Sequence, residues 1–244
     1  MKVLTLAVTI VLFSCSCNIK EHKDAPAHTG SMGSLNVRTE FFGRNGKPIF
    51  MDSMKVWYYD SVAIEELATI RSITDTLQRT TVSFTIDGYR YIDLKSRSWG
   101  LYKNFSDTSL LIRTGALPDT AFVDGGWTFY VNNLPMKGEP EILPDTIIAS
   151  TKYKRIKFSR VTRGPASYII GYLRCDKDKV KLFSLEKAYS DSVNCIMVRF
   201  NEFREGGSGP FAFRELRFLS DTLSEKELKV FAAWEINQRN KTVD

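Results

Sequence analysis

The sequence predicts a mainly β fold of the α+β class: an antiparallel curved sheet or half-barrel of hairpins with a C-terminal helix packed on it. Two observations carry this prediction. Short apolar and aromatic runs alternate with Gly, Pro, Asn and Asp at short intervals, which is typical of hairpins. A helix-capping pattern follows near the end of the chain. With 244 residues, of which 43% are hydrophobic and 25% charged, the chain suits one globular domain.

The first residues indicate an export segment. Lys2 precedes an apolar run over Val3–Phe13, which is too short to cross a bilayer as a helix. The tetrapeptide Leu12–Cys15 resembles the lipobox of bacterial lipoproteins: a branched apolar residue, a small residue and then cysteine. The resemblance implies that residues 1–14 are a signal peptide and that Cys15 is acylated as the new N-terminus. An ordinary cleaved signal peptide and an uncleaved anchor are the alternatives.

A lipidated flexible tether is expected over residues 15–34, which are polar and hold Pro26 and two glycines. Cys17 is the alternative lipidation site, although serine would then stand where the branched apolar residue belongs. Residues 35–244 are expected to form a single antiparallel β-rich domain. The expected location is the cell envelope, with the domain lipid-anchored to the membrane and facing the periplasm or the cell surface.

Three two-residue turns predict hairpins. Asn45-Gly46 separates the strands Val37–Phe42 and Pro48–Met51. Asp87-Gly88 separates Thr81–Ile86 from Tyr89–Leu94 and predicts a tight type I′ turn, because both central residues of that turn need positive φ. In this register Ile86 would face Tyr89, and Phe84 would face Tyr91.

The third hairpin is expected at Asp60-Ser61, where Tyr59 pairs with Val62. This register sets Trp57 opposite Ile64 and Lys55 opposite Glu66. A helix over residues 61–77 competes, since Ile64, Leu67, Ile70 and Ile73 recur at three-residue spacing; the strand is the interpretation adopted. Further strands are expected over Gly126–Val131, Ile147–Ala149, Tyr153–Phe158 and Phe211–Leu219.

The two cysteines of the expected domain are Cys175 and Cys195. Tyr168–Cys175, Val180–Glu186 and Val193–Phe200 predict three successive strands of a meander. Such a meander would place the cysteines at opposite ends, with Cα atoms on the order of 20 Å apart, beyond the reach of a disulfide. The expectation is therefore two free, half-buried thiols, although an exported location would permit a disulfide.

A helix is expected from Glu225 to about Asn237. Ser224 and Glu227 form a capping box, and Leu223 and Leu228 occupy the flanking positions of a hydrophobic staple. Leu228, Phe231 and Trp234 give the helix an apolar stripe, which must pack against the sheet.

Histidine usage excludes several kinds of site. Both histidines, His22 and His28, fall in the expected tether. The domain consequently lacks the imidazole of a Ser-His-Asp or Cys-His pair and of the usual zinc sites. No metal, cofactor or catalytic residue is predicted, and the protein is expected not to be an enzyme. A carboxylate-based hydrolase is the least favoured alternative, because no spacing picks out a carboxylate pair.

Two groups of side chains are candidate binding residues. Strand alternation can gather aromatic rings on one face of the sheet, as core or as the lining of an apolar cleft beneath the terminal helix. The candidate ligand-lining residues are Trp57, Tyr59, Tyr89, Tyr91, Trp127 and Phe129. A basic run offers contact with an anionic lipid or glycan surface, or is simply a solvated strand face. Its candidate residues are Lys152, Lys154, Arg155 and Lys157. A nucleic-acid partner is not expected for an exported protein.

Aromatic-rich hairpins such as Tyr89–Leu94, followed by a packing helix, resemble the curved-sheet half-barrels of the LolA/LolB lipoprotein-carrier type. The resemblance is architectural and implies an apolar ligand. The expected function is a lipid-anchored module that binds an acyl chain or a lipidated partner in an apolar cleft. The alternative is an envelope contact protein that binds protein or glycan without an internal cavity.

Mass spectrometry of the mature protein is expected to find an acylated cysteine as the first residue, at Cys15, because the lipobox residues precede it. An unmodified N-terminal cysteine would contradict the lipoprotein prediction, whereas acylation of Cys17 would move the site by two residues.

Overall fold

The computed structural model of the chain describes residues 31–74, 80–117, 122–123, 126–127, 136–160, 166–176 and 184–241. The N-terminal half holds β1 (Met32–Phe42), β2 (Pro48–Tyr59), β3 (Val62–Thr74), β4 (Thr80–Asp93), β5 (Ser98–Tyr102), β6 (Leu111–Ala116), β7 (Phe122–Val123) and β8 (Gly126–Trp127). The C-terminal half holds β9 (Met136–Ile148), β10 (Thr151–Arg160), β11 (Ser167–Arg174), α1 (Lys187–Val193), β12 (Ile196–Arg204), β13 (Pro210–Ser220) and α2 (Glu225–Lys241).

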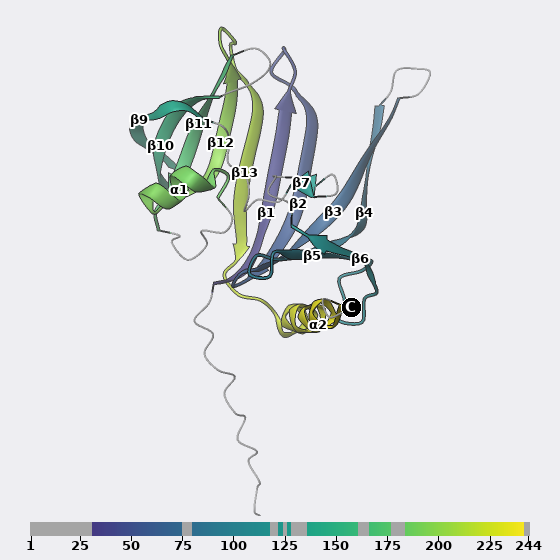
Figure 1. Ribbon diagram of the computed structural model, residues 1–244. Coiled ribbons are helices and arrows are strands. Elements are labelled where there is room, and N and C mark those ends of the chain that lie inside the picture. Colours follow the sequence, from purple (N-terminus) through teal and green to yellow (C-terminus); the bar gives the residue numbers. More distant parts are fainter. Residues whose placement is uncertain are drawn as a thin grey trace, which may run out of the picture.

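Two antiparallel meanders join into one sheet. The order of its 11 strands is β6-β5-β4-β3-β2-β1-β13-β12-β11-β10-β9, and the short strands β7 and β8 pair separately. Every pairing along the sheet is antiparallel, and β1 meets β13 at its centre. Figure 1 shows the sheet as a curved, unclosed surface with α2 at the lower end of the strands. The predicted fold class is thereby confirmed.

The two faces of the sheet carry different cores, because side chains alternate along each strand. One face, called here the helix face, carries Trp57, Ile64, Tyr91 and Tyr102, which pack against α2. The second, called here the opposite face, carries a larger cluster that runs from β1, β2 and β3 to β10, β11 and β12. Its fully buried members are Leu35, Val56, Tyr58, Ile169, Leu185, Ile196 and Met197.

The start of α2 follows the predicted capping pattern. Ser224 Oγ accepts a hydrogen bond from Glu227 N, and Glu227 Oε2 accepts one from Ser224 N. Leu223 and Leu228 both contact the helix-face core, as the predicted staple requires. The expected helix is confirmed, and it continues beyond Asn237 to Lys241.

Aromatic rings hold α2 on the sheet. Trp234 is fully buried and stacks on Tyr102 with ring centroids 3.8 Å apart. Trp57 Nε1 donates to Glu227 Oε1 at 2.7 Å, so the capping carboxylate also ties the helix to β2. A Cβ at Gly100 would lie 1.8 Å from Gln238 Nε2, so the glycine leaves room for this side chain of α2 against β5. Each large apolar side chain buried here stabilises the fold by about 1.5–3 kcal/mol.

Two predicted hairpins are confirmed. Asn45-Gly46 lies in the turn between β1 and β2, where Gly46 has φ 71°. At Asp60-Ser61, Tyr59 pairs with Val62 and Trp57 with Ile64, and Lys55 N donates to Glu66 Oε2. The competing helix over residues 61–77 is wrong, because the apolar residues of β3 are drawn into pairing with β2 and β4.

The predicted turn at Asp87-Gly88 is wrong. Strand β4 runs through it, with Gly88 paired to Leu67 and Ile86 to Ala68 across a bulge at Asp87. Gly88 does not adopt the left-handed backbone of a type I′ turn. A Cβ there would instead lie 2.7 Å from the carbonyl oxygen of Tyr102, so the glycine permits close approach of β5. The expected pairs Ile86–Tyr89 and Phe84–Tyr91 do not form, since these residues share one strand.

The predicted cysteine arrangement is also wrong. Cys175 and Cys195 form a disulfide with Cα atoms 4.2 Å apart. No strand separates β11 from β12 in the sheet, because Arg174 pairs directly with Ile196. Cys175, which follows Arg174, and Cys195, which precedes Ile196, therefore lie at the same end of the two strands. Where the strand Val180–Glu186 was expected, Glu186 instead caps helix α1 by accepting from Tyr189 N.

Other expectations shift or lie outside the described residues. The expected strand Ile147–Ala149 is the end of β9, and Ala149 belongs to the turn into β10 with φ 46°. Tyr153–Phe158 and Phe211–Leu219 fall within β10 and β13 as expected. Cys15, Cys17 and the signal peptide lie outside the described residues, as does Phe129.

Replacing the disulfide by Cys175→Ser with Cys195→Ser is expected to lower the free energy of unfolding by about 3 kcal/mol, because the bond closes a loop with a sequence separation of 20. Urea denaturation followed by circular dichroism measures this loss. The unsubstituted protein in reductant should lose the same amount, and an unchanged midpoint in both samples would contradict a stabilising bond.

Candidate functional site

The structure brings together four of the six aromatic candidates. Trp57, Tyr59, Tyr89 and Tyr91 all belong to the helix-face cluster or contact it. Trp57 and Tyr91 are only 5% and 1% exposed, so these rings are packed between the sheet and helix α2. Tyr59 and Tyr91 also line a groove of about 430 Å³ at the end of α2. Trp127 lies apart from this cluster in sequence, in the separate strand pair β7-β8.

The basic candidates on β10 are divided between the two faces. Lys154 lies on the same face of the sheet as Ile156, whereas Arg155 and Lys157 lie on the other face. Neighbouring β9 supplies partners for three of the four basic side chains. Lys152 pairs with Asp145 at 2.9 Å, Lys157 with Glu141 at 3.4 Å, and Arg155 Nε donates to the Pro144 carbonyl at 2.7 Å. The run therefore forms cross-strand pairs and not one continuous basic patch.

A row of directly paired residues crosses the opposite face. It can be followed strand by strand through the pairings, and it places polar side chains on β1, β2 and β13 beside apolar ones on β12 and β10. In order from β2 to β9, its members are Asp52, Thr39, Arg214, Phe200, Gly171, Ile156 and Ile142. The neighbouring row on the same face, two residues further along each strand, contains Phe50, Phe41, Ala212, Glu202, Ile169 and Phe158.

Glu202 is the anionic member of this region. Its side chain is nearly buried, and Arg160 Nη1 donates to both of its carboxylate oxygens at 2.9 Å. Ser167 Oγ donates to Oε1 at 3.0 Å. Three strands thus meet at one carboxylate, whose charge is compensated by a guanidinium and a hydroxyl.

Arg214 is the buried cation. Its Nε donates to Thr39 Oγ1 at 3.1 Å, across the central β1–β13 pairing. Burial and the neighbouring Arg160 lower the pKa of Arg214 to about 10, while Asp52 and Glu202 act in the other direction. The guanidinium remains charged at neutral pH in a region poor in water, where its field acts strongly on a nearby anion.

A cavity of about 90 Å³ lies between these groups. It is lined by Arg160, Glu202, Arg214 and Thr39 together with Phe41, Phe200, Ala212 and Phe213. The charged lining holds two guanidinium groups and one carboxylate. Phe41 also contacts Phe50, with ring centroids 5.8 Å apart, and the two residues are 38% and 40% exposed. The cavity therefore combines the Arg214 guanidinium with the partly exposed ring of Phe41.

A second buried charge pair lies on the same face. Glu65 on β3 pairs with Arg90 on β4, and both are 1% exposed. Arg90 Nη1 is 3.8 Å from Glu65 Oε2, and these atoms and Arg90 Nε have no hydrogen-bond partner. Burial raises the pKa of Glu65 to about 8, against the opposing effect of Arg90. This pair costs the fold energy, since buried charges without hydrogen bonds are poorly compensated.

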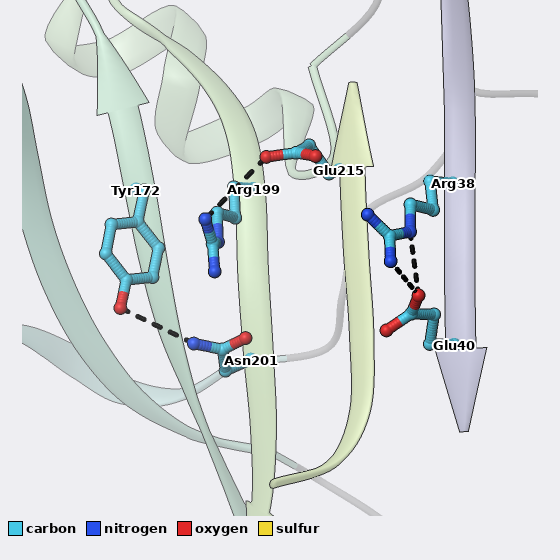
Figure 2. A network of polar contacts seen from close by, with 6 residues as sticks. All are labelled: Arg38, Glu40, Tyr172, Arg199, Asn201 and Glu215. Atoms are coloured by element: carbon cyan, nitrogen blue, oxygen red, sulfur yellow. Dashed lines mark hydrogen bonds and ion pairs between the residues drawn. The ribbon is translucent and has the colours of Figure 1, made fainter. Parts of the chain in front are cut away.

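The helix face carries a polar network of another kind. In Figure 2, Arg199 reaches Glu215 at 3.7 Å and Tyr172 OH accepts from Asn201 at 3.4 Å, while Arg38 bonds Glu40 along β1. The guanidinium groups of Arg199 and Arg38 also lie over the ring of Phe213, at 4.7 Å and 5.7 Å from its centroid. These contacts link β11 to β1 and stabilise the sheet.

The sequence patterns did not reveal Arg160, Glu202 and Arg214 as one site. Each lies in a strand whose buried and exposed residues alternate in the usual way. The three side chains come together only because of how β10, β11, β12, β13 and β1 are paired. The one available signal was a charged residue at a strand position where an apolar side chain is expected, as with Arg214 between Ala212 and Leu216.

Comparisons with known proteins do not assign the site. No family model matches the chain, and no curated protein is significantly similar to it. Within the described ranges, no cluster of three or more histidine, cysteine or acidic side chains could hold a metal ion. Neither described helix is both long and apolar enough to cross a membrane.

Glu65→Gln is expected to stabilise the protein increasingly as the pH rises. The folded-state pKa of Glu65, about 8, exceeds its ordinary value of 4.5, so its contribution to stability is present below pH 4.5 and is lost as the pH rises toward 8. The loss amounts to at most about 1.4 kcal/mol per pH unit. Urea midpoints at pH 5 and pH 8 measure it. Equal effects of the substitution at both pH values would contradict the raised pKa.

Proposed function

We propose that this chain is an exported, lipid-anchored envelope protein that binds the anionic head of an acyl chain in the opposite-face cavity. The observation that carries the proposal is the buried Arg214 guanidinium in a cavity lined by the partly exposed Phe41, whose ring contacts that of Phe50. A guanidinium can bind the carboxylate of the ligand, and the aromatic rings can pack against its hydrocarbon chain.

The disulfide supports the exported location. Disulfides persist in oxidising compartments and are rare in the cytosol. The Cys175–Cys195 bond, although not expected from the strand pattern, is of the kind that an exported location permits. An anchor at Cys15 would place the cavity at a membrane surface, where acyl chains are found.

The size of the cavity supports a small head group. A volume of about 90 Å³ corresponds to roughly three waters of liquid, enough for a carboxylate but not for a whole lipid. The chain would leave the cavity across Phe41 and Phe50, which lie on adjacent strands of the same face. Glu202 does not oppose the anion strongly, since Arg160 and Ser167 already bind its oxygens.

Three carboxylates of the strands are occupied by cations. Glu65 faces Arg90, Glu141 faces Lys157 and Glu202 binds Arg160. At the proposed site, the carboxylate of Glu202 is therefore assigned to holding Arg160 and not to hydrolysis.

Displacement of a fluorescent fatty acid tests the proposal. Arg214→Gln is expected to weaken binding at least about tenfold, because it removes a charged hydrogen-bond donor from a buried site. Arg217→Gln is the matched control: it lies on the same strand, is exposed, and should leave binding unchanged. A fatty alcohol of equal chain length should bind more weakly than the acid.

Three outcomes would overturn the assignment. Equal binding by Arg214→Gln and the unsubstituted protein, with circular dichroism showing both folded, would remove the head-group site. Loss of binding in Trp127→Ala alone would move the ligand to the predicted aromatic residues. Absence of any saturable binding would favour the contact-protein alternative, for which Ile49, 73% exposed on the β1–β2 hairpin, offers apolar surface.

A further inference from the structure

We infer that the groove at the end of α2 is a second binding site, for a neutral carbohydrate. The inference does not rest on the proposed acyl-chain site, which involves different residues on the opposite face. The groove lies where the β2–β3 turn, the β4–β5 turn and the last turns of α2 meet, and its volume is about 430 Å³. This volume falls within the range of pockets that hold small ligands, about 300–1,000 Å³.

The lining is dense in groups of both charges. Asp60, Asp93 and Glu235 supply carboxylates, and Lys95 and Arg239 supply cations. Ser61, Ser96, Ser98 and the amide of Gln238 add neutral donors and acceptors. Sugar hydroxyls both donate and accept hydrogen bonds, so they can satisfy both kinds of group at once. A ligand of strong single charge would be repelled by one half of this lining.

Some of these groups are fixed by the protein itself. Asp93 accepts from Lys95 N at 2.8 Å and from Ser96 Oγ at 2.7 Å, which holds the β4–β5 turn in shape. Glu235 pairs with Arg239 one helical turn later. These contacts order the walls of the groove before any ligand arrives, which lowers the entropic cost of binding.

Two groups remain available to a ligand. The side chains of Asp60 and Lys95 are exposed, and neither has a hydrogen bond or ion pair with another residue in the described part of the chain. They come from the two turns that border the groove. A hydroxyl donating to the carboxylate and another accepting from the ammonium would bridge these turns.

Tyr59 supplies the aromatic surface. It lines the groove and is partly exposed, while its ring is tilted against Phe231 with centroids 6.1 Å apart. The ring is therefore held in position by α2. The apolar face of a sugar ring can pack on such a supported ring while the hydroxyls reach the polar groups around it.

Saturation-transfer NMR with maltose and cellobiose on the mature protein tests the inference. Both Asp60→Gly and Lys95→Ala are expected to weaken binding at least about fivefold, because each removes one charged contact. Glycine suits position 60, where φ is 50°, so this substitution removes the carboxylate without straining the turn. Lys47→Ala, an exposed lysine in the β1–β2 turn, is the matched control and should leave binding unchanged.

The readouts separate this site from the acyl-chain site. Arg214→Gln should leave saccharide binding unchanged, and Asp60→Gly should leave fatty-acid displacement unchanged. Absence of saturation transfer to both disaccharides would overturn the inference, as would equal binding by Asp60→Gly, Lys95→Ala and the unsubstituted protein. Tighter binding of glucuronate than of glucose would also overturn it, because the lining carries three carboxylates against two cations.

Discussion

The antiparallel pairing of β1 with β13 is the constraint on which the rest of the structure depends. It joins two meanders, one from each half of the chain, into a single sheet. It brings Thr39 beside Arg214, so the cavity around Arg214 is assembled from both halves. It also fixes where the chain leaves β13, from which α2 returns across β2 to β5 and buries Trp234. Loss of this pairing would separate the sheet, the cavity and the helix together.

The charged side chains of the sheet differ in their exposure and in how strongly their pKa values are perturbed. The pair Arg199–Glu215 is partly exposed and rests on Tyr172 and Phe213, so it can exchange hydrogen bonds with water. Arg214 is buried, and its neighbours Arg160, Asp52 and Glu202 perturb its pKa. Perturbed ionisable groups in a cavity mark candidate sites with a physical rationale. Burial also raises the pKa of Glu65, but Glu65 does not line the cavity around Arg214.

Local sequence patterns predicted the elements whose signals act within a few residues. The Asp60-Ser61 hairpin was predictable because the Trp57–Ile64 and Lys55–Glu66 pairings agree on one register. The start of α2 was predictable because capping is a contact between residues three apart. Asp87-Gly88 misled because the glycine serves the approach of β5, which comes from later in the chain. The cysteines misled because β11 pairs directly with β12, while residues Lys187–Val193, within the loop between them, form α1. The cavity lined by Arg160, Glu202 and Arg214 could not be predicted, since these three charged residues meet only through strand registers.

The open sheet has two free margins of unlike character. One is β6, which is six residues long, and the other is β9, which is 13 residues long and contains Pro140 and Pro144. Proline has no amide hydrogen to offer a neighbouring strand, so β9 is a poor template for another chain despite its length. Copies of the domain would therefore be hindered from pairing through β9, edge to edge, into a continuous sheet. The two prolines thus protect the longer edge of an unclosed sheet from pairing with another strand.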